Sequence, residues 1–369
     1  MQLLQLVLFL IQSVFAAAIP GQIPFVSRPS RYFDIQAHRG GRGNIVENTL
    51  PAFAWALIDG STTLELDNGI TKDGAVVVWH DEDIVPRKCQ DTEPVFENDP
   101  DFPYVGKTLA NLTLAQIKTL DCGSQRQIEF PLQLTFPGTK ISTLKEVFDF
   151  VECADPQYEI RWNIESKIDP VYSNRTKSVQ EFVQRQHDIF VHSPYRFQIT
   201  YQSFDWRSIV AMKELDPAMT TSALIDIETA VMPDNSTSPW LAGLRLDNFE
   251  GSFGEQVAAA AKFIDADILS PADVASLDVD DPTQSGYVPF TTREMVDKAH
   301  ELGMLVMPWT VNRLNVAERI LNWKVDGIIT DYPNMIRRLV QQRGQHVAPK
   351  YPKKRVLECL KQHMESQNA

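Results

Sequence analysis

Short runs of apolar, β-branched and aromatic residues alternate along this chain with longer segments in which apolar residues recur about every 3.6 positions. The short runs predict strands at 34–38, 62–70, 75–79, 158–165, 197–201, 221–225, 263–269, 304–309 and 326–330. The periodic segments predict helices at 49–59, 143–153, 176–188, 205–214, 291–302, 314–323 and 333–342. Alternation of this kind from residue 34 to residue 342 predicts βαβ units and a parallel sheet.

The number of strands favours a closed α/β barrel. A (β/α)₈, or TIM, barrel has eight strands and takes about 250 residues as one domain, whereas an open doubly wound sheet is the alternative. Segments 62–70 and 75–79 are joined by only four residues, too few for parallel neighbours, so we expect a hairpin. If Lys72 and Asp73 formed its loop, Glu65 would face His80. The second strand of the hairpin would then be an appendage of the barrel.

Two segments depart from the strand–helix alternation. Residues 82–141 are rich in Pro, Asp and Phe, with one helix-like stretch near 113–120, and they predict a cap inserted after the hairpin that follows strand 2. We therefore expect a barrel domain over 30–343 that contains this insertion. The polar tail 344–369 has a short apolar pattern, and we expect it to pack on the outside of the barrel without a chemical role.

The first 18 residues form an uncharged apolar segment that ends in three alanines, which is typical of a signal peptide. An uncleaved anchor is the alternative. Three N-x-S/T sequons, at Asn111, Asn174 and Asn235, agree with a secreted, extracellular glycoprotein. We therefore expect a secreted protein with no stable membrane anchor.

An oxidising compartment would favour pairing of the four cysteines. Four cysteines allow three pairings, among which the sequence does not decide. We prefer Cys89–Cys122, which would staple the cap, and Cys153–Cys359, which would tether the tail. The cysteines have no C-x-x-C spacing, which disfavours a zinc site.

The chain carries 35 Lys and Arg against 48 Asp and Glu, a formal net charge of −13. Binding to nucleic acid or to an anionic membrane needs clustered basic residues, so this balance argues against both partners. A small molecule is the expected partner. The sequence does not indicate an oligomeric state.

Polar residues stand at the carboxyl ends of several predicted strands, where barrel enzymes place their active sites. They include two imidazoles, several carboxylates and two cations. The residues in question are His38, Arg39, Glu65, Asp67, His80, Asp81, Glu165, Lys167, Trp309 and Asp331.

These residues lie in motifs that resemble the glycerophosphodiester phosphodiesterase family. The segments AHRGGRGNIVENTLPAFAWAL and LELDNGITKDGAVVVWHD are similar to the start of that family, and IESK, QSFD, MPWTVN and DGIITDYP follow in the family's order. The resemblance extends from about Asp34 to about Leu339. Val46, in place of a common proline, and Asn68, in place of a common aliphatic residue, are small departures from the family pattern.

The resemblance implies a metal site and an acid–base pair. Glu65, Asp67 and Glu165 offer only hard oxygen ligands, which select one divalent ion, Ca²⁺ or Mg²⁺. Glu65 and Asp67 share a face because they alternate on one strand. His38 and His80 would be the general acid and base, in an order that the sequence leaves open, with the substrate's adjacent hydroxyl or water as the nucleophile.

Other strand-end residues have expected supporting roles. Arg39 and Lys167 would bind phosphate oxygens, although a salt bridge from Lys167 to Glu165 is an alternative. Trp309 would form an aromatic wall for the glycerol or a cationic headgroup, or simply pack in the barrel. We interpret Asn48 and Thr49 as a helix N-cap and Asp331 as an anchor of the last loop. Glu47 is ambiguous and could support the site from behind.

The sequence thus predicts a secreted, metal-dependent enzyme that cleaves glycerophosphodiesters to glycerol 3-phosphate and an alcohol. One alternative is a phospholipase D-like enzyme acting on lysophospholipids or sphingolipids, which should have an open, apolar mouth. The other is a non-catalytic secreted binding barrel, disfavoured by the two histidines and three carboxylates.

Overall fold

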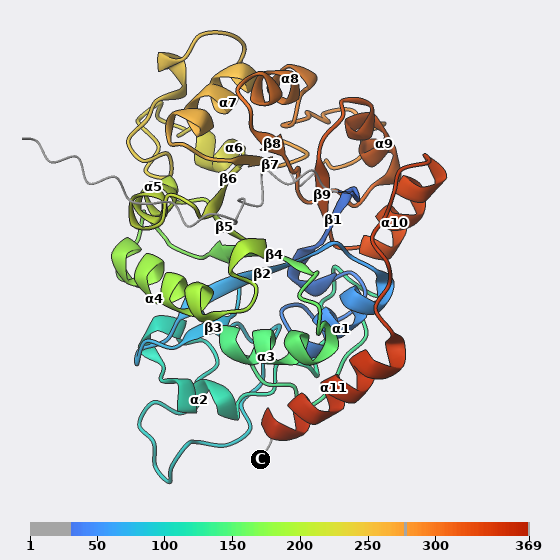
Figure 1. The fold of residues 1–369 in the computed structure, drawn as a ribbon. Helices are drawn as coiled ribbons and strands as arrows, with labels where there is room; N and C mark the ends of the chain where they lie inside the picture. Colours follow the sequence, from blue (N-terminus) through green and yellow to red (C-terminus); the bar gives the residue numbers. More distant parts are fainter. Residues whose placement is uncertain (1–30, 277–278, 368–369) are drawn as a thin grey trace, which may run out of the picture.

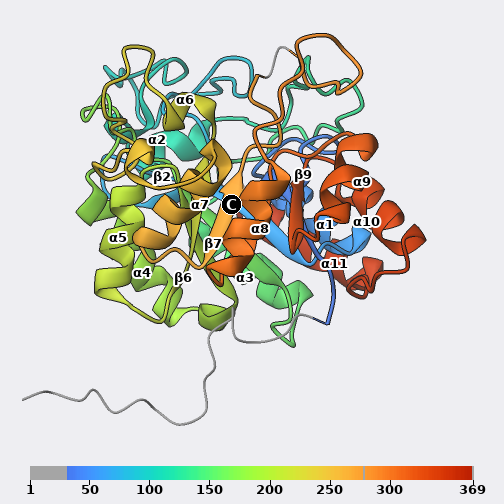
Figure 2. The same ribbon diagram turned by 90° about the horizontal axis from the view of Figure 1, so that it is seen from above.

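The structure is a computed structural model that describes residues 31–276 and 279–367. Eight parallel strands follow one another around a nearly closed barrel in the order β8-β7-β6-β5-β4-β2-β1-β9 (Figures 1 and 2). They are β1 (Asp34–Ala37), β2 (Thr63–Ile70), β4 (Arg161–Ser166), β5 (Ile199–Ser203), β6 (Thr220–Ile225), β7 (Ile268–Pro271), β8 (Leu305–Val306) and β9 (Gly327–Thr330). The predicted TIM barrel is therefore confirmed, and the predicted signal peptide 1–18 lies outside the described residues.

Backbone hydrogen bonds continue from β8 to β9, where no regular ladder forms. The amide nitrogens of Asp326, Ile329 and Val311 donate to the carbonyl oxygens of Val306, Pro308 and Ile329, each at 3.0 Å. Pro308 has no N–H to donate, which limits regular pairing just after β8. These bonds bring the two ends of the sheet together.

The strand β3 (Val76–Val78) pairs antiparallel with β2 and lies off the barrel path, as predicted. Its register differs from the prediction. Asn68 pairs with Val78 and Ile70 with Val76, so facing residues sum to 146 instead of 145. The loop has three residues, 72–74, and Gly74 takes a φ of +86°, the left-handed conformation that three-residue hairpin loops require. The predicted pairing of Glu65 with His80 is therefore wrong.

Helices surround the barrel and bury one apolar face each against it (Figure 1). They are α1 (Leu50–Asp59), α3 (Leu144–Ala154), α4 (Val179–His192), α5 (Trp206–Leu215), α6 (Ile227–Ala230), α7 (Phe253–Phe263), α8 (Arg293–Glu301), α9 (Leu314–Asn322), α10 (Pro333–Gln342) and α11 (Lys353–Gln367). Every predicted helix is present. Helices α6, α7 and α11 were not predicted as helices, and β7 begins at Ile268 instead of residue 263.

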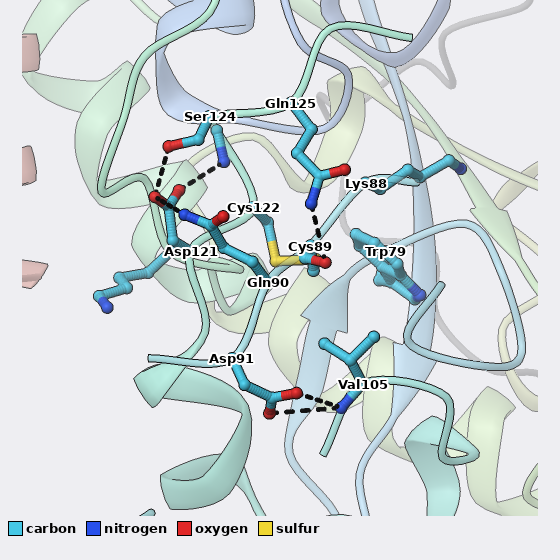
Figure 3. Close-up of a disulfide and its surroundings, with 12 residues drawn as sticks. Trp79, Lys88, Cys89, Gln90, Asp91, Val105, Asp121, Cys122, Ser124 and Gln125 are labelled. Carbon is cyan, nitrogen blue, oxygen red and sulfur yellow. Dashed lines mark hydrogen bonds between the residues drawn. A yellow bond between two sulfur atoms is a disulfide. The ribbon is translucent and has the colours of Figure 1, made fainter. Parts of the chain in front are cut away.

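The inserted cap between β3 and α3 has a small hydrophobic core of its own, separate from that of the barrel. It holds the short helix α2 (Leu114–Thr119), within the predicted stretch 113–120, and buries Ile84, Tyr104 and Ile117. The disulfide Cys89–Cys122 links two segments of the cap (Figure 3). Figure 2 shows the cap on the same side of the barrel as the loops that follow α6 and β7.

The C-terminal tail forms helix α11, which packs against α1 and α3 on the outside of the barrel (Figure 1). Val356 and Leu360, part of the apolar pattern in the sequence, are buried there. A second disulfide joins Cys153 of α3 to Cys359 of α11. Both preferred cysteine pairings are thus confirmed.

Removing the tail disulfide should destabilise the protein more than removing the cap disulfide. Cys153 and Cys359 are 206 residues apart in sequence, whereas Cys89 and Cys122 are 33 apart. A longer closed loop restricts the unfolded chain more, so Cys153→Ser with Cys359→Ser should lower the free energy of unfolding by roughly 3–5 kcal/mol. Chemical denaturation of both double variants measures this, and a larger loss on removing Cys89–Cys122 would contradict it.

Candidate active site

The sequence-predicted carboxylates converge on the neighbouring strands β2 and β4. Glu65 and Asp67 lie midway along β2, and Glu165 is the last but one residue of β4. Glu65 and Asp67 alternate on β2 and so share its inner face, while Asp67 pairs in register with Glu165 of β4. One oxygen of each carboxylate lies within 4.8 Å of the others. All three side chains are buried. The strand-end positions read from the sequence therefore form a single cluster, which we call the carboxylate triad.

The charges of the triad are only partly balanced by protein groups. Burial raises the pKa of Glu65 well above its usual value, and the neighbouring charges of Asp67 and Glu165 raise it further. Burial likewise raises the pKa of Glu165 to about 7, against the opposing charge of Lys167. Asp67 Oδ1 is buried and has no hydrogen-bond partner among the described residues. Three close, buried carboxylates and an unpaired oxygen fit a hard divalent cation.

Arg39 lies directly behind the triad, at the end of β1. Its backbone N–H donates to Glu65 Oε2 at 2.7 Å, its Nε lies 3.2 Å from Asp67 Oδ2, and its Nη1 donates to Glu47 Oε1 at 3.2 Å. The side chain is only 8% exposed. Arg39, predicted to bind phosphate, therefore has carboxylates as its partners here, and Glu47 supports it.

Of the two residues predicted to form the N-cap of α1, Thr49 does so and Asn48 does not. Thr49 caps the helix by accepting from the Ala52 N–H, as expected. Asn48 instead donates from Nδ2 to Asp67 Oδ2 at 2.8 Å, with a left-handed φ of 56°. That conformation turns its amide toward β2, because asparagine tolerates it better than most residues do. Asn48 therefore orients a triad carboxylate.

His38 forms a dyad with Asp331, which was predicted only to anchor the last loop. His38 Nδ1 lies 2.6 Å from Asp331 Oδ1, which also accepts from Arg42 Nε at 2.8 Å, while Asn312 donates to Oδ2 at 2.7 Å. Burial, with Arg39 and Arg42 nearby, lowers the pKa of His38 to about 4. The imidazole is therefore neutral at neutral pH and able to accept a proton.

His80 lies between a cation and an anion. Its Nε2 is 3.2 Å from Lys167 Nζ, and its Nδ1 is 3.2 Å from Asp81 Oδ1. Burial, Arg39 and Lys167 hold the pKa of His80 well below its usual value. Lys167 also donates to Glu165 Oε1 at 2.7 Å, so the expected alternative of a Lys167–Glu165 salt bridge is present.

An open pocket of about 410 Å³ adjoins this side of the cluster. Glu165, Lys167 and His80 form its inner end. The other lining residues are Asp81, Glu82, Asp83, Val85, Ser166, Ile168, Arg175, Phe204 and Trp240. The pocket therefore gives a molecule from solvent access to one histidine, one cation and one carboxylate of the site.

The aromatic wall of the pocket differs from the one predicted. Trp309 does not line the pocket; its ring lies 5.2 Å from that of Phe204, and its Nε1 donates to the Ser270 carbonyl. Phe204 and Trp240 supply the aromatic surface. Phe204 directly follows β5, so its strand-end position was the available signal. Trp240 stands in a loop without a comparable signal.

Comparisons with known proteins show the family to which the chain belongs. The profile of the Glycerophosphoryl diester phosphodiesterase family matches residues 38–335. A glycerophosphodiester phosphodiesterase of Caldanaerobacter subterraneus is 27% identical over 311 residues, which cover 84% of this chain and 98% of that protein.

Solved structures show the same fold. A Silicibacter pomeroyi protein assigned to the glycerophosphoryl diester phosphodiesterases has a TM-score of 0.66 and 27% identity, covering 87% of this chain and 97% of that one. An Oleispira antarctica phosphodiesterase in complex with the product sn-glycerol-3-phosphate has a TM-score of 0.58 and 20% identity, covering 84% and 97%. The profile match spans most of the chain and contains every residue of the site described above. This chain therefore belongs to the glycerophosphoryl diester phosphodiesterase family and is a phosphoric diester hydrolase of that family.

Proposed function

We propose that this protein hydrolyses glycerophosphodiesters to glycerol 3-phosphate and an alcohol, with a divalent metal ion and two histidines. The observation that carries the proposal is the carboxylate triad together with a pocket of about 410 Å³ that Glu165, Lys167 and His80 line. The Oleispira antarctica phosphodiesterase, whose product is sn-glycerol-3-phosphate, supports the same substrate class.

The carboxylates of Glu65, Asp67 and Glu165 would hold the ion, which is Ca²⁺ or Mg²⁺ because the ligands are all hard oxygens. When bound, such an ion offsets the charge of a phosphodiester and polarises it for attack. Asn48 and the Arg39 backbone N–H each hold one carboxylate oxygen in place. These bonds orient the ligands before an ion arrives.

His38 would be the general base and His80 the general acid. Asp331 accepts the Nδ1 proton of His38, which leaves Nε2 free to take a proton from a substrate hydroxyl or from water. His80 lines the pocket that would contain the leaving alcohol, so it is placed to protonate the departing oxygen. A bound phosphodiester anion would offset Lys167 and Arg39, and would thereby raise the pKa of His80 toward the range that a general acid needs.

Lys167 is the cation best placed to contact a phosphate oxygen in the pocket. Its ammonium group lies between Glu165 and His80 and 5.6 Å from the centre of the Phe204 ring. Arg39 would act on the phosphate from behind the triad, where its charge also stabilises the carboxylates.

Activity on a small panel of phosphodiesters tests this function. We expect hydrolysis of glycerophosphocholine and glycerophosphoethanolamine, loss of activity with EDTA, and recovery with Ca²⁺ or Mg²⁺. Glycerol 3-phosphate, measured with a coupled dehydrogenase, is the product to detect. Activity on lysophosphatidylcholine alone would instead indicate the phospholipase D-like alternative, and activity that survives EDTA would refute the metal assignment.

We also propose that the protein is secreted and glycosylated. Two disulfides suit an oxidising compartment, and the sequon residues Asn111, Asn174 and Asn235 are all exposed. In the part of the chain that the structure describes, no helix has the length and apolar character to cross a bilayer. Expression in eukaryotic cells should place the protein in the medium, with a mass that falls on endoglycosidase treatment. Retention inside the cells would contradict secretion.

A further inference from the structure

Lys88, in the cap, is a buried cation that the proposed chemistry does not use. Its side chain is 3% exposed, and its Nζ donates to Glu47 Oε1 at 2.6 Å and to Asp81 Oδ2 at 2.5 Å. A lysine ammonium group is costly to bury unless charged partners surround it. Here both partners are carboxylates, and each also contacts a residue of the active site.

Through Asp81, Lys88 connects to His80. The second oxygen of Asp81, Oδ1, is 3.2 Å from His80 Nδ1, and the other ring nitrogen of His80 is 3.2 Å from Lys167 Nζ. Because Lys167 can only donate, His80 Nε2 accepts in the neutral ring and Nδ1 carries the proton. Asp81 accepts that proton, so it fixes both the tautomer and the orientation of the ring.

Through Glu47, Lys88 connects to Arg39, which contacts the carboxylate triad. Glu47 also accepts from Arg39 Nη1 at 3.2 Å and from Gln127 Nε2 at 3.1 Å. Burial alone would raise the pKa of Glu47, but Arg39 and Lys88 hold it well below its usual value. Glu47 is therefore a charged acceptor shared by the cap and by the loop that follows β1.

The backbone is restrained directly after Lys88. Cys89, the next residue, is bonded to Cys122, and Gln90 exchanges two backbone hydrogen bonds with Asp121. The ammonium group of Lys88 also lies 5.4 Å from the centre of the ring of Trp79, which is the residue before His80 (Figure 3). The disulfide and the backbone pairing thus hold Lys88 in contact with the carboxylates of Glu47 and Asp81.

We propose that Lys88 is a positioning residue for catalysis: it holds Asp81, and through Asp81 the imidazole of His80, in the orientation that the reaction needs. The cap is then a part of the catalytic machinery and not only a cover for the pocket. This inference rests on the proposed role of His80 as an acid–base group.

Lys88→Met, which keeps the length of the side chain and removes its charge, tests the inference. We expect kcat for glycerophosphocholine to fall about 10–100-fold with KM changed by less than about 3-fold, because a misplaced imidazole affects the reaction more than substrate binding. Lys88→Arg should recover most of the loss. Lys118→Met is the matched control, since Lys118 is also a cap lysine in an ion pair, with Glu146 at 2.5 Å. It should keep the parental kcat.

A double-mutant cycle separates positioning from a general structural role. If Lys88 acts through Asp81, the Asp81→Asn/Lys88→Met variant should lose no more kcat than the worse single variant. Parental kcat in Lys88→Met, or losses that multiply in the double variant, would overturn the inference. If Lys88→Met did not fold, Asp81→Asn alone would carry the test. It removes the charge and leaves one acceptor oxygen for two donors, Lys88 and His80, while the Lys88–Glu47 pair stays intact. Parental kcat there would also overturn the inference.

His80→Ala distinguishes this inference from the function on which it rests. Parental kcat in His80→Ala would refute the acid–base role of His80. An impaired His80→Ala beside an unimpaired Lys88→Met would refute only the positioning role of Lys88.

Discussion

Glu65→Gln is expected to lower kcat about 10³-fold or more and to weaken Ca²⁺ or Mg²⁺ binding. The change keeps the shape of the side chain and removes one of the three charges of the triad. It also puts an amide where Glu65 Oε2 now accepts from the Arg39 N–H at 2.7 Å. A metal contributes several kcal/mol of charge stabilisation to such a reaction, which corresponds to about three powers of ten in rate.

Steady-state kinetics and calorimetric metal titration measure this effect together. Glu250→Gln is the matched control, because Glu250 is exposed and outside the site, and it should leave both quantities unchanged. Loss of metal binding with loss of activity supports the triad as the metal site. Parental kcat in Glu65→Gln would refute it. Lost activity with unchanged metal affinity would assign Glu65 another role.

Hydrophobic patterning predicted most of the fold because a barrel repeats one simple unit. The buried strands are short apolar runs, so β1, β2 and β9 lie within one or two residues of their predicted bounds. Helix α7 was missed because four of its eleven residues, FGEQVAAAAKF, are alanines, which mark a buried face less clearly than larger apolar residues do. The hairpin register depended on the conformation of one residue, Gly74, which the pattern of apolar residues does not report.

The site was predictable where a residue's role follows from its position on a strand. Glu65, Asp67 and Glu165 meet because β2 and β4 are parallel neighbours in the barrel, with Asp67 and Glu165 in register. The supporting contacts were not predictable, because they join residues far apart in sequence. Lys88 meets Glu47, 41 residues away, and His38 meets Asp331, 293 residues away. The conformations of the loops decide which of these residues meet, and loop conformation produces no periodic pattern in the sequence.

The position of Asp331 after the last strand predicted only one of the two roles of this residue. An aspartate after the last strand was expected to anchor a loop, and its bond with Asn312 agrees with that. The same carboxylate also faces His38, because β1 and β9 are paired neighbours in the barrel. A single residue after β9 therefore contacts both the loop that follows β8 and the imidazole that follows β1.

His38→Ala is expected to lower kcat about 10³-fold, within the range that a lost general base usually costs. Asp331→Asn should cost less, about 10–100-fold, since its amide can still accept from His38 Nδ1. Asp331 opposes the effects that lower the pKa of His38 to about 4, so removing its charge lowers that pKa further. The acid limb of kcat/KM, expected near pH 4, should therefore move to lower pH in Asp331→Asn.

Kinetics from pH 3 to pH 8, at saturating metal, separate these effects from damage to the fold. Asp331 directly follows Thr330, the last residue of the barrel strand β9. Thermal melting must therefore show that His38→Ala and Asp331→Asn both stay folded. An acid limb that moves to higher pH in Asp331→Asn would contradict a base held by an anion, because a lost negative charge cannot make an imidazole easier to protonate. Parental kcat in His38→Ala would show that the proton leaves the nucleophile by another route and would remove His38 from the mechanism.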